Sequence, residues 1–229
     1  MRGGHDTSFT QNRELSWLNF NERVLEEADD PLVKPLEKLK FIEIFDSNLT
    51  EFFMIRVGSL YDLTLEEMEI IDNKTNMNQR EQIEAIMTRL RPLYEKKDLY
   101  YNNLLQELKE FGIHILDPKE LTEEEYKEIE DYFDNFITPI LSPQIVDSFH
   151  PFPHLVNKDL YVVLRMRRIY GPEVSKKVQK NDITYENKDF IGIITVPNVL
   201  PSFYTLSSGE TRFILTEKIV HEFASKIFE

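Results

Sequence analysis

One apolar pattern constrains the fold of this chain most, because it predicts a single very long helix. Apolar residues recur at spacings of three and four from Ile83 to Phe111, over about eight helical turns, and Gly112 stands just past the end. We expect this helix to begin near Asn78. Such a helix is stable only when its apolar face is covered, so we expect an antiparallel bundle with the preceding helices. A coiled coil is the alternative, but the pattern covers one helix only.

The residues before this helix supply its expected partners. A first helix, ended by residues 29–31, has an apolar face made of Trp17, Phe20, Val24, Leu25 and Ala28. A second, short helix should be buried on most of its circumference, because its apolar positions are crowded: Leu36, Leu39, Phe41, Ile42 and Phe45. A third helix would bury Phe53, Val57, Leu60 and Tyr61. Three helices should therefore meet at one corner.

A polar break at residues 46–48 is predicted to separate the second and third helices. Asn48, the last residue of the break, has two interpretations. Its side chain suits a helix N-cap, where it would accept backbone N–H bonds. Because phenylalanines flank the break, the same carboxamide also suits hydrogen bonding to the edge of a flat heterocycle such as a purine. The two roles are compatible, and the pattern leaves both open.

The second half of the chain has an α+β pattern. Short strands are predicted at 113–116, 160–166, 190–196, 203–206 and 212–215, with a polar connection over 169–189. Thr122 and Glu125 form a capping-box pattern for a helix whose apolar stripe is Tyr126, Ile129, Phe133, Phe136 and Ile137. We therefore predict a flexible tail at 1–11, a helical domain at 12–111, and an α+β domain with a small, mostly antiparallel sheet at 112–229.

The last residues predict a helix that needs a partner. Thr216 is in position to cap it, and its buried face would consist of Ile219, Val220, Phe223 and Ile227. Because the sequence stops at Glu229 with no closing signal, we expect the second domain to be truncated there. The alternative is a stand-alone acidic interaction module that binds a protein through an exposed helix at 216–229, without catalysis.

Charge and motif content exclude several classes of function. The net charge of −14 repels nucleic acid and anionic lipid, so we expect no nucleic-acid partner. There is no cysteine, no apolar run long enough to span a bilayer, no P-loop, no dinucleotide fingerprint and no HExxH motif. Prolines impose an extended path on His150 and His154, which argues against a metal site. Two basic clusters are expected to be solvated rather than polyanion sites: Lys158 with Arg165, Arg167 and Arg168, and Lys176 with Lys177 and Lys180.

Two long motifs resemble one protein family. RELSWLNFNERVLEEA, followed by PLEKLKFIEIFDSNLTEFFMIRV, resembles the amino-terminal domain of bacterial polyphosphate kinases of the histidine-phosphorylating type. ITPIL at 137–141 and HPFP at 150–153 are similar to the next domain of that family. The resemblance runs in order over essentially the whole chain. It departs at Thr50, where the family usually has an acidic residue, and at Ser202, where an arginine is common.

The resemblance implies a function and a site. Polyphosphate kinases reversibly transfer the terminal phosphate of ATP to polyphosphate through a phosphohistidine, with Mg²⁺. It implies that Asn48 contacts the adenine of ATP, that the second domain makes dimer contacts, and that no catalytic or metal-binding residue lies in this portion. Arg56 also matches the family, although an ion pair within the chain is its simpler role. We expect a homo-oligomer in the cytoplasm, with peripheral membrane association left open, and no synthase activity from this chain alone.

Overall fold

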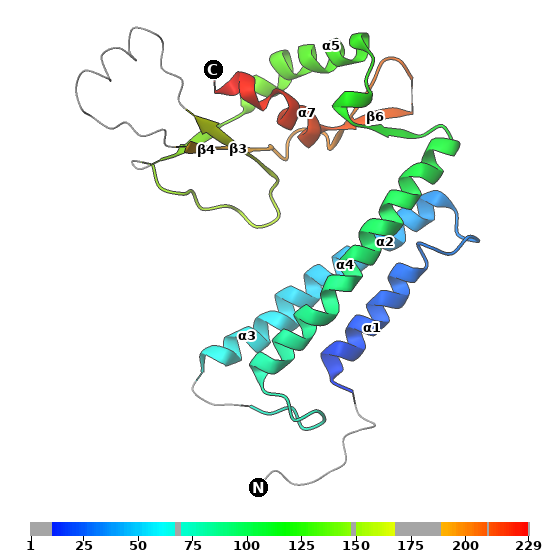
Figure 1. The fold of residues 1–229 in the computed structure, drawn as a ribbon, viewed down its shortest axis with the longest axis vertical. Helices are drawn as coiled ribbons and strands as arrows, with labels where there is room; N and C mark the ends of the chain where they lie inside the picture. Colours follow the sequence, from blue (N-terminus) through cyan, green and yellow to red (C-terminus); the bar gives the residue numbers. More distant parts are fainter. Residues whose placement is uncertain (1–10, 67–69, 148–149, 168–188, 210, 229) are drawn as a thin grey trace, which may run out of the picture. The chain divides into compact units, whose positions relative to one another are not determined.

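A computed structural model describes residues 11–66, 70–147, 150–167, 189–209 and 211–228. The chain divides into two compact units, Met1–Gly112 and Ile113–Glu229. The first unit is helical and the second combines helices with small sheets (Figure 1). The predicted α+β class, with an amino-terminal helical bundle, is therefore confirmed. Among the described residues, no helix has the length and apolarity needed to cross a bilayer.

The first unit is an antiparallel bundle built around its longest helix, α4 (Figure 1). Its elements are α1 (Arg13–Glu26), α2 (Pro35–Phe52), the π-helical turn η1 (Phe53–Val57), α3 (Gly58–Leu65) and α4 (Gln79–Glu110). α4 packs on α1, α2 and α3. It begins with a capping box formed by Asn78 and Glu81, and Gly112 follows its end with a left-handed φ of 78°. The long helix, its start near Asn78 and its end before Gly112 were predicted, whereas the pairing of Asn78 with Glu81 was not.

The burial of α1 differs from the predicted stripe. Leu18, Asn21 and Leu25 form the buried face, with Ala28 just past the helix, whereas Phe20 is 49% exposed. The helical spacing of apolar residues in α1 fits two stripes that differ by one position. The prediction chose the stripe with the aromatic residues Trp17 and Phe20, whereas the structure buries the neighbouring one. These two rings lie instead at the edge of a surface pocket.

The predicted break at residues 46–48 was wrong. α2, η1 and α3 follow one another without interruption from Pro35 to Leu65, so the second and third predicted helices are one helical segment. Two side chains donate hydrogen bonds to backbone carbonyls at this polar stretch, one from α1 and one from α2 itself. Asn21 of α1 donates to the carbonyl of Phe45, and Thr50 Oγ1 donates to the carbonyl of Asp46 (3.0 Å). The bond from Asn21 offsets the weak helix preference of the stretch, whereas the bond of Thr50 to a carbonyl of its own helix does not stabilise the helix.

α2 is also buried on one face only, which corrects the expectation of burial all round. Its buried residues are Lys38, Ile42, Phe45, Leu49 and Phe52. Leu36, Leu39 and Ile44 are exposed. The buried Lys38 ammonium lies 2.8 Å from a carboxylate oxygen of Glu107, an ion pair that ties α2 to α4. The density of apolar residues alone therefore predicted more packing neighbours than α2 has.

Among its described residues, the second unit has two three-stranded sheets. Its strands are β1 (His114–Leu116), β2 (Pro143–Val146), β3 (Tyr161–Arg167), β4 (Asp189–Thr195), β5 (Phe203–Thr205) and β6 (Arg212–Leu215). One sheet has the order β1-β6-β5, with a parallel β1–β6 pair, and the other has the antiparallel order β2-β4-β3. The strand β2 was not predicted. Most of the polar connection predicted at 169–189 lies outside the described residues.

Helices α5 (Glu123–Tyr132) and α7 (Thr216–Phe223) share the core of the second unit with residues of both sheets. A π-helical turn, Phe133–Ile137, continues α5, and a short 3₁₀ helix, Ala224–Ile227, continues α7. Of the predicted α5 stripe, Ile129, Phe133 and Ile137 are fully buried, whereas Phe136 is exposed. The ring centroids of Tyr126 in α5 and Phe223 in α7 lie 5.4 Å apart, so the two helices pack directly on each other.

One expectation for the last helix was wrong, and most of its predicted buried face is confirmed. Thr216 does not cap α7, because its hydroxyl donates to the carbonyl of Pro201 and its side chain is buried. The predicted buried residues Ile219, Val220 and Phe223 lie in the core of the second unit, so the same unit covers the apolar face of α7. The exposed helix required by the interaction-module alternative is therefore absent.

Candidate functional site

A surface pocket of about 290 Å³ lies in the first unit, between α1 and the α2–η1 segment. Its lining combines aromatic, amide and charged side chains: Trp17, Phe20, Asn48, Glu51, Phe52, Ile55 and Arg56. The rings of Trp17 and Phe52 are stacked, with centroids 4.3 Å apart and planes within 2° of each other. Phe52 is buried, so it holds the indole of Trp17 in a fixed plane at the pocket. Such a wall suits a flat ligand.

Asn48 brings a fixed amide to this pocket. It lies inside α2 and is not the helix cap that one interpretation of the sequence predicted. Its Nδ2 donates to Oδ1 of Asn21 (2.8 Å), and Nδ2 of Asn21 in turn donates to the carbonyl of Phe45 (3.1 Å). No hydrogen bond to Asn48 Oδ1 is found among the described residues. Oδ1 of Asn48 therefore remains as an acceptor for a ligand, while the Nδ2 end of the amide faces Asn21.

Arg56, from η1, also lines the pocket, but its charge is already paired. Its Nη1 lies 3.1 Å from Oε2 of Glu14, a residue at the start of α1 whose side chain is 12% exposed. The predicted intrachain ion pair is thus confirmed. With Glu51 on the same lining, the pocket carries no surplus positive charge, and its composition suits a nucleobase better than a phosphate chain.

The other residues considered from the sequence do not form a site. His150 Nδ1 lies 2.9 Å from Oδ1 of Asp147, and both His150 and His154 are exposed. Among the described residues, no group of three or more His, Cys, Asp or Glu side chains is placed to hold a metal ion. Arg165 and Arg167 are exposed on β3, and both have partners. Arg168, Lys176, Lys177 and Lys180 lie outside the described residues.

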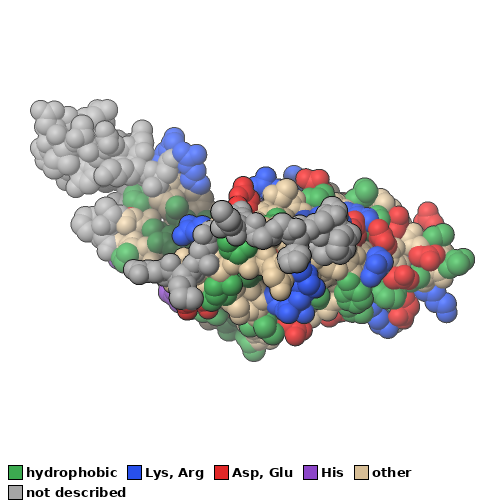
Figure 2. Space-filling model, turned by 90° about the horizontal axis from the view of Figure 1, so that it is seen from below, with side chains coloured by type: hydrophobic (Ala, Val, Ile, Leu, Met, Phe, Trp, Pro, Cys, Tyr) green, Lys and Arg blue, Asp and Glu red, His purple; other side chains and the backbone are tan. Residues whose placement is uncertain are grey.

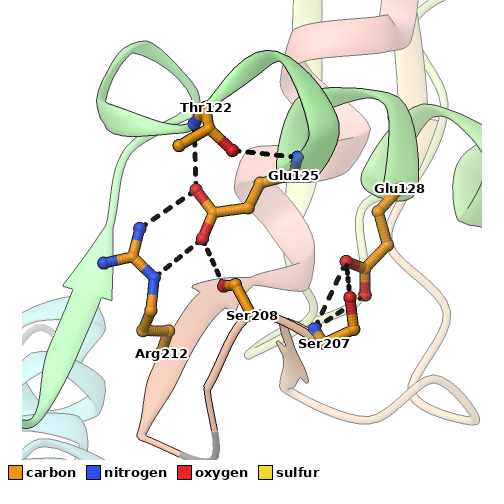
Figure 3. Close-up of polar contacts among 6 residues, drawn as sticks. All are labelled: Thr122, Glu125, Glu128, Ser207, Ser208 and Arg212. Atoms are coloured by element: carbon orange, nitrogen blue, oxygen red, sulfur yellow. Dashed lines mark hydrogen bonds and ion pairs between the residues drawn. The ribbon is translucent and has the colours of Figure 1, made fainter.

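The most strongly perturbed carboxylate lies in the second unit and is a structural anchor (Figure 3). Glu125 is 2% exposed, and its carboxylate accepts hydrogen bonds from Arg212 Nε (2.7 Å), Arg212 Nη2 (3.0 Å), the Ser208 hydroxyl and the Thr122 backbone (2.9 Å). The hydrogen bonds from Arg212, helped by Ser208 and Thr122 and opposed by burial, lower the pKa of Glu125 to about 2.

This anchor fixes α5 to β6 and to the connection between β5 and β6. Near Glu125, Glu128 accepts hydrogen bonds from the Ser207 backbone (3.0 Å) and the Ser207 hydroxyl (2.6 Å) (Figure 3). It also accepts one from the Tyr204 hydroxyl (3.0 Å). Because protein donors already surround both carboxylates, neither is placed to act as a general acid or base. The capping box of Thr122 and Glu125 was predicted, but its link to Arg212 was not.

Surface charge offers little support for a polyanion site. On the face shown in Figure 2, Lys and Arg side chains are interspersed with Asp and Glu side chains. The mixture agrees with the net charge of −14. On that face, the described side chains give no strong positive field that would hold a long chain of phosphates.

Sequence reasoning missed the aromatic part of the pocket. Trp17 and Phe20 were predicted to be core residues, and Phe52 was noted only as a neighbour of Asn48. The signal available was the density of aromatic residues on both predicted helices. That signal does not tell a buried ring from one that lines a pocket, because both follow the same helical spacing.

Comparison with known proteins assigns the family. The profile described as the polyphosphate kinase N-terminal domain matches residues 10–116, and the profile of the polyphosphate kinase middle domain matches residues 124–229. The chain belongs to the polyphosphate kinase family. The polyphosphate kinase of Bacillus cereus is 39% identical over 227 residues, which are 98% of this chain and 31% of that protein. The polyphosphate kinase of Halalkalibacterium halodurans is 37% identical over 228 residues, 98% of this chain and 30% of that protein.

A solved structure shows the same fold. The crystal structure of the polyphosphate kinase from Porphyromonas gingivalis matches 95% of this chain and 30% of its own, with a TM-score of 0.76 and 23% sequence identity. The present chain thus spans about 30% of the length of the polyphosphate kinases it matches. It corresponds to the N-terminal and middle domains of the family.

The two departures from the polyphosphate kinase motifs occupy structural positions. The Thr50 hydroxyl bonds to the backbone of its own helix, as described above. The carbonyl of Ser202 accepts the backbone N–H of Thr216 at 3.1 Å, which ties the start of β5 to the start of α7. Neither position brings a charged group toward the Asn48 pocket.

Proposed function

We propose that this chain supplies the adenine-facing side of the ATP site of a polyphosphate kinase. In that enzyme the terminal phosphate of ATP passes reversibly to polyphosphate through a phosphohistidine. The observation that carries the proposal is the free amide oxygen of Asn48 beside the stacked pair Trp17 and Phe52. An amide oxygen accepts a hydrogen bond from an amino group on a base edge, and an aromatic wall suits its flat ring.

The phosphate chemistry is assigned to the other two thirds of the polyphosphate kinase length. Phosphoryl transfer needs concentrated positive charge and Mg²⁺ around the transferred group. In this pocket the charge of Arg56 is balanced by Glu14, and the chain as a whole carries −14. This chain would therefore hold ATP by its base, while the rest of the enzyme supplies the sites for Mg²⁺ and polyphosphate and the histidine that is phosphorylated. We expect this chain alone to have no synthase activity.

The family also supports proposals on assembly and location. We assign dimer contacts to the second unit, which corresponds to the polyphosphate kinase middle domain, and propose a homo-oligomer. We propose a cytoplasmic location, where ATP is available, with peripheral membrane association as an alternative. Crosslinking of the intact enzyme tests the first proposal, and fractionation of cells tests the second.

Complementation tests the adenine role. This chain is mixed with the separately expressed remainder of a related polyphosphate kinase, and ATP-dependent polyphosphate formation is measured with wild type, Asn48→Ala and the control Asn19→Ala. Asn19 lies on α1 and lines a different pocket. We expect Asn48→Ala to raise KM for ATP about 2- to 10-fold, as the loss of one hydrogen bond predicts, with kcat largely kept and the control unchanged.

Two results would contradict this role. Restored activity that is indifferent to Asn48→Ala would leave Asn48 as a helix residue that only contacts Asn21. Failure to restore activity, with both proteins folded by circular dichroism, would argue against a contribution of this chain to the ATP site. Polyphosphate formation by this chain alone would refute the assignment of the phosphate chemistry to the rest of the enzyme.

A further inference from the structure

Asn21 is a polar residue at the centre of the first unit. Its side chain is 0% exposed, and both ends of its amide are engaged: Nδ2 donates to the Phe45 carbonyl, and Oδ1 accepts from Asn48. Phe45 lies inside α2, so its carbonyl also has the backbone partner that an α-helix provides. The bond from Asn21 is thus not needed to satisfy that carbonyl.

The Phe45 carbonyl determines which way both amides face. A carbonyl oxygen only accepts, so Asn21 must present Nδ2 to it and must present Oδ1 at its other end. Asn48 must then present Nδ2 to Asn21, which leaves Asn48 Oδ1 as the end available to the pocket. An isolated amide can reverse its two ends by rotating about χ2, and would offer either an oxygen or an NH₂ group. Here the buried partner removes that choice.

We propose that Asn21 is a positioning residue that makes Asn48 a hydrogen-bond acceptor toward the pocket, and thereby selects bases with an amino group over bases with a carbonyl there. The inference rests on the proposed adenine role of Asn48. Adenine carries a 6-amino group, whereas hypoxanthine carries a 6-oxo group on the same ring framework. In the same pose, hypoxanthine would set its oxygen against Asn48 Oδ1, and a locked amide is unable to reverse to accommodate it.

The test uses the 229-residue chain and the neutral nucleosides adenosine and inosine. Neutral ligands avoid repulsion by the chain's charge of −14. Trp17 is the chain's one tryptophan and lines the pocket, so quenching of its fluorescence reports binding directly. The variants are Asn21→Leu, which removes both hydrogen bonds, and Asn21→Asp, which keeps an acceptor for Asn48. Asn19→Leu, on the same helix but at the other pocket, is the matched control.

We expect the wild type and Asn19→Leu to prefer adenosine over inosine. Asn21→Leu should lower this preference about 2- to 10-fold, the equivalent of one hydrogen bond, and Asn21→Asp should restore most of it. If Asn21→Leu reduces the folded fraction by circular dichroism, Asn21→Ala replaces it, because it avoids overpacking. An unchanged preference in a folded Asn21→Leu or Asn21→Ala protein, together with its loss in Asn48→Ala, would overturn the positioning role and leave the proposed function standing.

A second measurement tests, without any nucleoside, whether Asn21 locks the Asn48 amide in one orientation. In nuclear magnetic resonance spectra, one Nδ2 proton of Asn48 should exchange slowly with solvent in the wild type and rapidly in Asn21→Leu. Equal exchange in both proteins would overturn the lock. If the lock is observed but the wild type and Asn48→Ala bind adenosine equally, or neither binds it, the proposed adenine role fails while the positioning of Asn48 by Asn21 stands.

Discussion

Replacing Glu125 by glutamine should destabilise the second unit by an amount that depends on pH. The folded state lowers the pKa of this carboxyl from 4.5 to about 2. Each tenfold change in an acid constant corresponds to about 1.4 kcal/mol, so ionised Glu125 adds about 3 kcal/mol to the free energy of unfolding at neutral pH. The loss of a partner from a buried ion pair gives a cost of similar size.

The sign of the pH dependence follows from the lowered pKa. The stabilisation is fully present above pH 4.5, where the carboxyl is ionised in the folded and unfolded chains alike. It is lost as the pH falls toward about 2, where the folded carboxyl also takes up a proton. The difference in stability between wild type and Glu125→Gln should therefore be about 3 kcal/mol at pH 7 and should shrink steadily below pH 4.5.

Hydrogen exchange measured by mass spectrometry separates the two units in this experiment. Peptides from α5 and β6 should exchange faster in Glu125→Gln at pH 7, whereas peptides from α4 should not change. Glu124→Gln is the control, because Glu124 is an exposed residue in the same helical turn. A Glu125→Gln protein as stable as wild type at pH 7, or a difference that does not depend on pH, would refute the buried ion pair as an anchor.

Three further substitutions test the packing. Gly112→Ala should cost about 1 kcal/mol in urea unfolding, because its φ of 78° is strained for alanine although no atom lies within 4 Å of the added methyl. Phe133→Ala should cost about 3–5 kcal/mol, seen as faster hydrogen exchange in the second unit, because the ring is fully buried. Burial opposes ionisation of Glu22, but hydrogen bonds from Lys96 and Arg89 lower its pKa, so Glu22→Gln should cost about 1 kcal/mol at pH 7. This last effect should fade as the pH falls below 4.5, and urea unfolding followed by Trp17 fluorescence measures it.

Local signals predicted the beginnings and ends of several helices well. The box of Thr122 and Glu125, the start of α4 beside Asn78 and its end before the left-handed Gly112 lie where the sequence predicted them. These features depend on residues a few positions apart, so the chain needs no distant partner to form them. Periodicity was less reliable for burial, because a stripe shifted by one residue fits the same spacing, as α1 shows.

Local patterns misled the prediction where a distant residue offers a side chain or carbonyl a second partner. The polar stretch at 46–48 has a weak preference for helix, and α2 continues through it with support from Asn21, more than twenty positions earlier in the chain. Thr216 has the residue type of a cap but donates to Pro201 instead. In both places a side chain had a choice of partners, and packing decided between them.

The same division holds for the candidate site and for the chain as a whole. Composition, periodicity and motifs predicted the α+β class, the long α4 helix, the family resemblance and Asn48 as a candidate site residue, because these signals can be read from the chain without its packing. Only the tertiary structure placed Asn48 beside Trp17 and Phe52, paired Arg56 with Glu14, and covered the apolar face of α7. It also fixed the direction of the Asn48 amide through Asn21. These contacts join residues far apart in the chain, and their geometry exists only once the helices have packed.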